Sequence, residues 1–179
     1  MIHFVGAGPG AADLITMRGH QLLTQADVII YAGSLVNPEL LQYAKASCSI
    51  YNSASMTLEE VMDVMKQAEE KNQMTVRLHT GDPSLYGAIR EQMDQLDAYN
   101  ITYDVVPGVS SFCGAAAALK AEYTLPNVSQ SVIITRMAGR TPVPEQEEIA
   151  LLAAHQATMV IFLSTGMLEP LSQRLLAGG

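Results

Sequence analysis

The sequence has few charged residues, two cysteines and no tryptophan. Charged residues make up 16% of the 179 residues and hydrophobic residues 49%, a balance that excludes an intrinsically disordered chain. Acidic residues outnumber basic residues by 18 to 10, so the net charge is −8. This charge argues against a nucleic-acid-binding protein, whose surface would be basic. A chain of this length buries roughly 70% of its unfolded surface, so it can build a core without disulfides or metal.

The cysteine pattern and the hydrophobic runs exclude further classes. Cys48 and Cys113 form no CxxC pair and no zinc-binding set with the four histidines, so we expect reduced thiols and no metal. The longest hydrophobic runs are too short to span a bilayer, and the first residues lack the basic segment of a signal peptide. The sequence therefore predicts a soluble, cytoplasmic protein with neither a membrane nor a nucleic acid as partner.

Short apolar strands alternate with amphipathic helices along the chain. We expect Asp13 to cap the first helix, and Thr57 with Glu60 to form a capping box. This alternation predicts an α/β fold with a mostly parallel sheet, which places ligands at the carboxyl ends of the strands. The predicted strands are 2–5, 28–31, 74–79, 101–106, 131–135 and 158–163, and the predicted helices are about 14–25, 38–44, 58–68, 84–99, 110–119, 145–154 and 167–177.

The alternation is interrupted between Lys120 and Asn127, where Pro126 prevents a continuing helix. We therefore predict two α/β domains. Residues 1–119 would form the N-terminal domain, with a mostly parallel sheet, and residues 120–179 the start of the C-terminal domain. Only two strands follow the break, too few for a self-sufficient sheet. We expect the second domain to be incomplete, or to be completed by a partner.

Small-residue turns follow three of the predicted strands. They are Gly6–Gly10, Gly81–Pro83 and Pro107–Ser111, and their glycines allow a ligand to approach the backbone closely. The first turn has the spacing G-x-G-x-G, and the second strand ends at Tyr31 without the acid that holds a dinucleotide ribose. This pattern disfavours an NAD or FAD oxidoreductase, which stays open as an alternative. Plain tight turns and helix caps are the structural alternatives.

Taken together, these turns resemble the tetrapyrrole methylase family. The resemblance is carried by residues 5–16, 81–87 and 107–111, and it extends from Ile2 to about Leu163. Residues 135–145 resemble the branch of the family that methylates carbon 11 of a precorrin in cobalamin biosynthesis. Two alternatives remain: a sister methylase that acts at another ring carbon, and a chain that binds the cofactor without turnover.

The resemblance implies a homodimeric enzyme of two α/β domains with the cofactor cleft between them, which binds S-adenosylmethionine there and releases S-adenosylhomocysteine. Relatives continue beyond residue 179, and they often have methionine where this chain has Leu163. By their place in the family motifs, the cofactor-binding residues would be Pro9, Thr80, Gly81, Asp82, Leu85, Ser110, Ser111 and Leu163.

The resemblance also implies a tetrapyrrole substrate, whose acetate and propionate groups call for cations. We predict that Arg136 and Arg140 contact it, with Arg77 as a third candidate. The alternative is a solvated loop in which the arginines pair with nearby glutamates. Methyl transfer needs no metal and no covalent protein intermediate, so we assign no catalytic residue. His79 and Asp104 are candidate acceptors for the proton that leaves the substrate.

Overall fold

The computed structural model describes all 179 residues, which form two compact units, residues 1–115 and residues 116–179. The α/β fold predicted from the sequence is confirmed, because helices alternate with parallel strands throughout the chain. None of the helices is both long enough and apolar enough to cross a membrane.

A five-stranded parallel sheet forms the centre of the first unit. Its strands lie in the order β3-β2-β4-β1-β5, and every neighbouring pair is parallel. Every residue of β1 and β4 is buried, as expected for parallel strands that are covered on both faces. The strands are β1 (Ile2–Gly6), β2 (Val28–Tyr31), β3 (Ser49–Asn52), β4 (Thr75–His79) and β5 (Tyr103–Val106).

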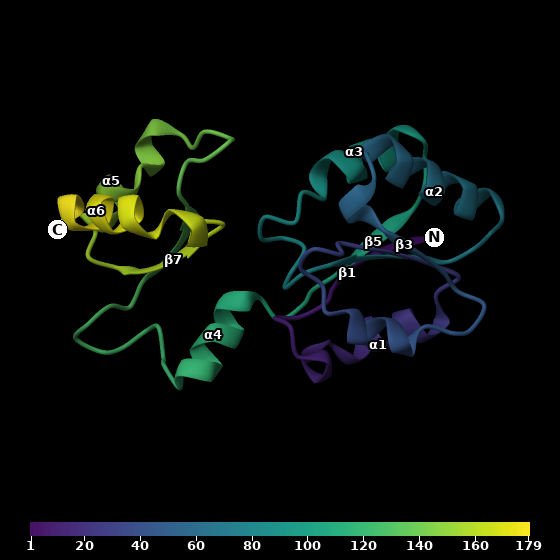
Figure 1. Cartoon of the computed structure of the whole chain (residues 1–179), viewed down its shortest axis with the longest axis horizontal. Helices are drawn as coiled ribbons and strands as arrows, with labels where there is room; N and C mark the ends of the chain where they lie inside the picture. The colour runs from purple at the N-terminus through teal and green to yellow at the C-terminus, as the bar shows by residue number, and fades with distance from the viewer. The chain divides into compact units, whose positions relative to one another are not determined.

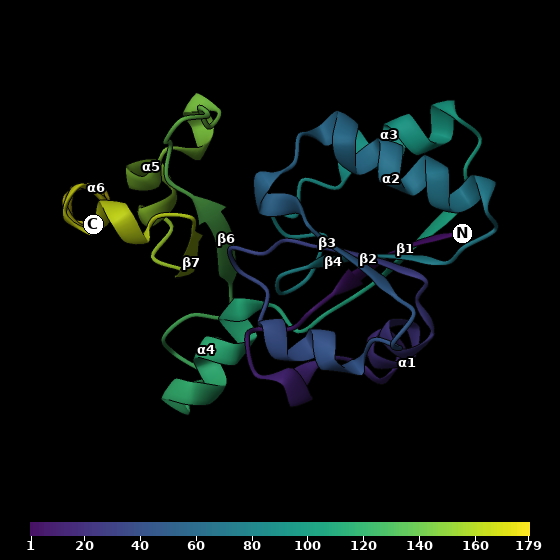
Figure 2. The ribbon, with the colours of Figure 1, turned by 45° about the vertical axis from the view of Figure 1, so that its right-hand side comes forward.

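Helices cover both faces of this sheet. Helix α1 (Met17–Gln25) lies on one face, and α2 (Leu58–Glu70) and α3 (Arg90–Ala98) lie on the other (Figure 1; Figure 2). Successive residues of a strand point to opposite faces, so Val5 belongs to the core beneath α1 and Phe4 to the core beneath α2 and α3. The unit therefore has two apolar layers separated by one sheet.

The second unit has a parallel pair of strands, β6 and β7, and two helices, α5 and α6, that lie side by side (Figure 2). Met137, Ile149 and Leu171 form its small buried core. Helix α4 spans the boundary between the units and buries none of its residues, although it is rich in alanine. The elements are α4 (Ser111–Leu119), β6 (Val132–Arg136), α5 (Ile149–Ala153), β7 (Thr158–Phe162) and α6 (Leu168–Gly178).

Several predicted boundaries differ from the structure. The helix predicted over 84–99 begins only at Arg90, because Tyr86 and Ala88 adopt positive φ values of 55° and 50°. Strand β3 was not predicted, since all four of its residues are exposed and show no hydrophobic alternation. The short helix predicted over 38–44 is confirmed, as a 3-10 helix over Pro38–Tyr43.

The helix caps were predicted with mixed success. The capping box of α2 is confirmed, with Thr57 and Glu60 each bonded to the other's backbone N–H. Asp13 does not cap α1, because it lies in a short 3-10 helix over Ala12–Leu14. Thr16 takes that place, and its hydroxyl oxygen accepts a hydrogen bond from the Gly19 backbone N–H at 3.1 Å.

The turns after β1, β4 and β5 come into backbone contact at the carboxyl edge of the sheet. A Cβ atom built on Gly108 would lie 2.7 Å from the Gly6 Cα and closer still to the Gly81 carbonyl oxygen. Real Cβ atoms do not approach backbone so closely, and no flexible side chain is there to move away. Only glycine fits at residue 108, so this residue fixes how closely the three turns can pack.

We expect Gly108→Ala to lower the free energy of unfolding of the first unit by about 1–3 kcal/mol, because backbone must shift to admit the methyl group. Gly166→Ala is the matched control. A Cβ there meets nothing within 4 Å, so its effect should stay within about 1 kcal/mol. Urea unfolding of both variants measures the difference. Equal stabilities would contradict the contact between the turns.

Candidate functional site

The predicted cofactor residues of the first unit lie at the carboxyl ends of three adjacent strands. In the sheet, Gly6 pairs with His79 on one side and Val5 with Val106 on the other, so the three turns leave it side by side. Gly8 and Gly81 then form an isolated bridge, with N–O distances of 3.2 Å and 2.9 Å. The first two turns are thus hydrogen-bonded to each other directly after the strands from which they leave.

Asp82 connects the second turn to the third. One carboxylate oxygen accepts a hydrogen bond from the Gly108 backbone N–H at 2.8 Å, and the other accepts bonds from the Ser84 backbone N–H and hydroxyl. Partial burial acts to raise the pKa of Asp82, but these hydrogen bonds outweigh it, so the pKa lies below its usual value. Asp82 is therefore ionised at neutral pH, and both of its oxygens already have protein partners.

The first residues of α4 close the site from the third turn. Ser110 is buried, and its carbonyl oxygen accepts the backbone N–H groups of Cys113 and Gly114. A Cβ at Gly114 would lie 2.6 Å from the Cβ of Pro9, so the proline ring packs directly on this helix. Pro9, Ser110 and Ser111 are thus brought together with Gly81 and Asp82, as the motifs predicted for the first unit.

A fourth segment, after β2, also supports the site, and sequence reasoning missed it. The Asn37 side-chain amide donates a hydrogen bond to the Gly10 carbonyl oxygen at 2.8 Å, while its own oxygen accepts the Glu39 N–H at 3.0 Å. The Thr80 hydroxyl donates to the Leu35 carbonyl oxygen at 3.4 Å. The Asn-Pro pair at residues 37 and 38 signals a helix cap, but no sequence pattern reveals the bond to Gly10.

The remaining predicted residues belong to the second unit. Leu163 follows β7 with a φ of +56° and an exposed side chain. Arg136 turns back onto its own loop, where its guanidinium donates to the carbonyl oxygens of Thr141 at 3.1 Å and Pro142 at 2.7 Å. Arg140 is exposed, which leaves it as the cation of this loop that faces solvent.

The two candidate proton acceptors have different surroundings. Asp104 is hydrogen-bonded to the His3 ring nitrogen Nδ1 at 2.7 Å, in the body of the sheet rather than at its carboxyl edge. His79 is buried at the end of β4, and its Nε2 has no hydrogen-bond partner. Burial, helped by the positive charge of Arg77, lowers the pKa of His79 to about 3. His79 is therefore a neutral imidazole just beneath the second turn.

The structure also bears on the dinucleotide alternative. The acid nearest to strand β2 in sequence is Asp27, which precedes the strand rather than following it. Its carboxylate accepts hydrogen bonds from the Lys45 ammonium at 2.6 Å and from the Met74 backbone N–H at 2.8 Å. Asp27 thus lies at the end of the strand opposite to the turns, where it cannot hold a ribose bound by them.

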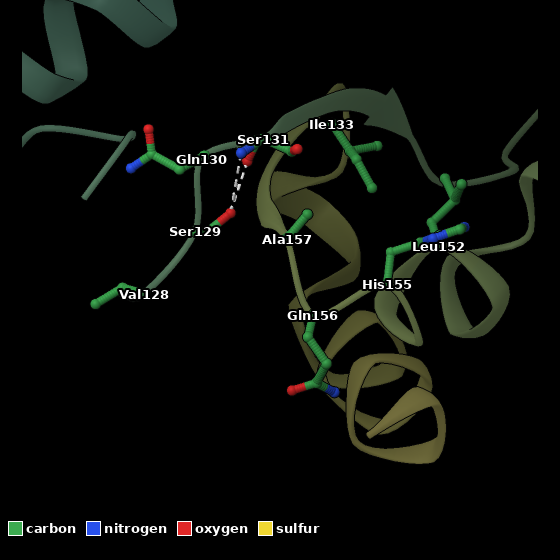
Figure 3. A pocket seen from close by; sticks show the side chains of 9 residues that line it. All are labelled: Val128, Ser129, Gln130, Ser131, Ile133, Leu152, His155, Gln156 and Ala157. Atoms are coloured by element: carbon green, nitrogen blue, oxygen red, sulfur yellow. Dashed lines mark hydrogen bonds between the residues drawn. The ribbon is translucent and has the colours of Figure 1, made fainter. Parts of the chain in front are cut away.

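A separate hollow of about 650 Å³ lies in the second unit (Figure 3). Its walls include Ile133, Leu152 and His155, and none of the predicted site residues lines it. The Ser129 hydroxyl on its wall donates to the Ser131 carbonyl oxygen and accepts the Thr158 N–H, so it serves the local backbone. This hollow therefore shows none of the chemistry predicted for the site.

Comparison with known proteins identifies the family. A family model described as tetrapyrrole (corrin/porphyrin) methylases matches residues 1–179. A Methanocaldococcus jannaschii protein named cobalt-precorrin-4 C(11)-methyltransferase is 57% identical over 175 residues, which cover 98% of this chain and 68% of that protein. The family resemblance predicted from the turns is confirmed.

Solved structures agree with this result. The X-ray structure of a cobalt precorrin-4 methyltransferase, described as a cobalamin biosynthetic enzyme, is 44% identical, with a TM-score of 0.96 over 99% of this chain and 74% of that chain. A Thermus thermophilus uroporphyrin-III C-methyltransferase complexed with S-adenyl homocysteine is 23% identical, with a TM-score of 0.78 over 99% of this chain and 72% of that one. The second likeness shows the fold alone.

We expect the burial of His79 to make the first unit sensitive to acid. The unfolded chain binds a proton near pH 6.5, whereas folded His79 binds one only near pH 3, so stability falls as the pH drops between these values. This term amounts to a loss of about 2 kcal/mol between pH 7 and pH 5. Urea unfolding at the two pH values measures it.

His79→Met should remove this pH-dependent term, because methionine does not titrate. His155→Gln, at an exposed histidine of the second unit, is the control. If His79→Met and the unchanged protein lose the same stability on acidification, the neutral state assigned to His79 is wrong.

Proposed function

Since this chain belongs to the tetrapyrrole (corrin/porphyrin) methylases, we propose that it transfers a methyl group from S-adenosylmethionine to carbon 11 of precorrin-4 or its cobalt form. The observation that carries this proposal is the 57% identity, over nearly the whole chain, to a relative named for that reaction. The reaction would form part of cobalamin biosynthesis.

The residues of the first unit fit the cofactor. The three turns meet at the carboxyl edge of the sheet, where α/β proteins bind their ligands, and this packing requires glycine at residue 108. Ser111 begins α4 and Ser110 directly precedes it, so the two serines lie at the positive end of a helix dipole, which favours a carboxylate. We propose that Pro9, Thr80, Gly81, Asp82, Leu85, Ser110 and Ser111 bind the cofactor, together with Leu163 of the second unit.

When bound, S-adenosylmethionine supplies an electrophilic methyl group on a positively charged sulfur. The chain's task is then to hold the acceptor carbon in line with that methyl group and to exclude water. Alignment of this kind is worth up to about 7–11 kcal/mol in well-oriented systems. Neutral, buried His79 supports the second turn from below. With a pKa of about 3 its ring is too weak a base to hold a proton at neutral pH, so we assign it no proton transfer.

Arg140 and Arg136 would serve the substrate in different ways. The Arg136 guanidinium holds the loop through the carbonyl oxygens of Thr141 and Pro142, so we propose that it shapes the loop. Arg140 is exposed, and a guanidinium matches a carboxylate through two parallel hydrogen bonds. We propose that Arg140 contacts an acetate or propionate group of the tetrapyrrole.

We also propose that the enzyme works in the cytoplasm as a homodimer, and that residues 1–119 and 120–179 belong to separate domains. The dinucleotide alternative is disfavoured by the position of Asp27. A sister methylase that acts at another carbon remains the second candidate, and the position of the new methyl group distinguishes it.

Turnover by the full chain is the direct test of the proposed reaction. We expect transfer of a 13C-labelled methyl group from S-adenosylmethionine to carbon 11, seen as one new 13C NMR signal from the tetrapyrrole. Metal-free and cobalt-containing precorrin-4 are offered in separate reactions, so that the preferred form is measured. A methyl group at another carbon would support the sister methylase. Cofactor binding without any transfer to either form would contradict the proposed activity.

Asp82→Ala should weaken S-adenosylhomocysteine binding about tenfold, because it removes a proposed ligand contact and the bond that holds Gly108. Asp63→Ala, at an exposed acid on α2, is the matched control and should not change the affinity. Native mass spectrometry with S-adenosylhomocysteine, FAD and NAD offered together measures binding and reports the oligomeric state. Unchanged affinity in Asp82→Ala would refute this role, and a retained dinucleotide would favour an oxidoreductase.

A further inference from the structure

Arg77 is a buried cation without an acidic partner. It lies in the middle of β4 and is 7% exposed, yet none of the ion pairs in the structure includes it. Burial lowers the pKa of its guanidinium to about 10, so it still carries a full charge at neutral pH. A buried charge without a counter-ion is costly, and proteins usually pair such groups.

Only neutral groups contact this guanidinium. Its Nε donates to the Gln92 side-chain oxygen at 3.1 Å, and its Nη1 donates to the Ile30 carbonyl oxygen at 3.2 Å. The Gln92 amide in turn donates to the carbonyl oxygen of Ala88 at 3.1 Å. The third nitrogen of the guanidinium, Nη2, has no hydrogen bond. Arg77 is thus held in place through two of its five N–H donors, and both N–H groups of Nη2 are unused.

A cavity of about 200 Å³ lies over Arg77. Gln92 and Ala88 line it on one side, and Ser53 and Thr57, before the start of α2, line it on the other. Ala88 belongs to the left-handed turn that continues from the Gly81–Pro83 motif. At about 30 Å³ for each water the cavity has room for roughly six waters, enough for one small polar group but not for a macrocycle.

We propose that this cavity receives one carboxylate arm of the tetrapyrrole and that the unused Nη2 of Arg77 binds it. The inference rests on the proposed function, because it takes its ligand from the proposed substrate. A carboxylate supplies the missing counter-charge, and it matches the guanidinium by charge-assisted hydrogen bonding. The fixed geometry of Arg77 means that little side-chain freedom is lost on binding.

Glu91 is the acid that lines the same cavity, and it is exposed. Two further acids, Glu59 and Glu60, lie in the first turn of α2, where Glu60 bonds to the Thr57 backbone N–H at 2.8 Å. Glu91 is too far from Arg77 to form an ion pair, so its charge opposes an incoming carboxylate without neutralising the cation. The two residues should therefore affect substrate binding in opposite directions.

Variants of Arg77 and Glu91 test this in the full chain, by the Kd for precorrin-4 with S-adenosylhomocysteine bound. Arg77→Gln keeps amide donors but removes the charge, and it should raise this Kd about tenfold or more. Glu91→Gln should lower it by about two- to fivefold, because a repulsive charge is lost. Neither change should alter the Kd for S-adenosylhomocysteine by more than about twofold. Arg18→Gln, at an exposed arginine of α1, is the control and should change neither Kd.

The outcomes distinguish an Arg77 that binds the substrate from one that only supports the fold. A folded Arg77→Gln with unchanged tetrapyrrole affinity overturns the proposal, and so does a Glu91→Gln that binds the substrate no more tightly. If Arg77→Gln loses its near-UV circular dichroism, Glu91→Gln decides alone. If the unchanged chain turns over normally and both variants keep its tetrapyrrole affinity, only the proposed binding in this cavity is refuted. Failure of the unchanged chain to bind any tetrapyrrole refutes the proposed function as well.

Discussion

The close packing of three backbone turns at the carboxyl edge of the first sheet is the constraint on which the site depends. Gly6, Gly81 and Gly108 meet there without side chains between them, and the Asp82 carboxylate ties the second turn to the third. A side chain at residue 108 would force the turns apart. The same contact therefore fixes how the three strand ends and the turns that follow them are arranged.

Only 16% of the residues in this acidic chain are charged. Three ionisable groups near the second turn differ in their charge state. Asp82 is kept ionised by backbone and hydroxyl donors, and His79 is kept neutral by burial. Arg77 remains charged although only neutral groups contact it. Arg77 and His79, two residues apart on β4, thus place a fixed cation and an uncharged ring close to the second turn.

Sequence patterns located the turns more reliably than they located element boundaries. The strands before the three turns and the capping box of α2 followed from apolar runs and from the Thr57–Glu60 spacing. The start of α3 did not, because no propensity rule predicts left-handed backbone at Ala88. Strand β3 could not be predicted either, because its four residues are exposed and show no hydrophobic alternation. It is a strand because it pairs in parallel with β2. Local patterns describe what a segment prefers, whereas these exceptions come from neighbours distant in sequence.

The sequence by itself determined the α/β class, the family and the composition of the three turns, because strand and turn signals and family motifs are local properties of the chain. Tertiary structure alone decided how those residues are used. In the folded chain both carboxylate oxygens of Asp82 accept hydrogen bonds, Arg136 donates to its own loop, and Asn37 donates to the Gly10 carbonyl oxygen. It also left Arg77 without a counter-ion. Hydrogen-bond partners and burial depend on segments that only folding brings together, so no local pattern contains them.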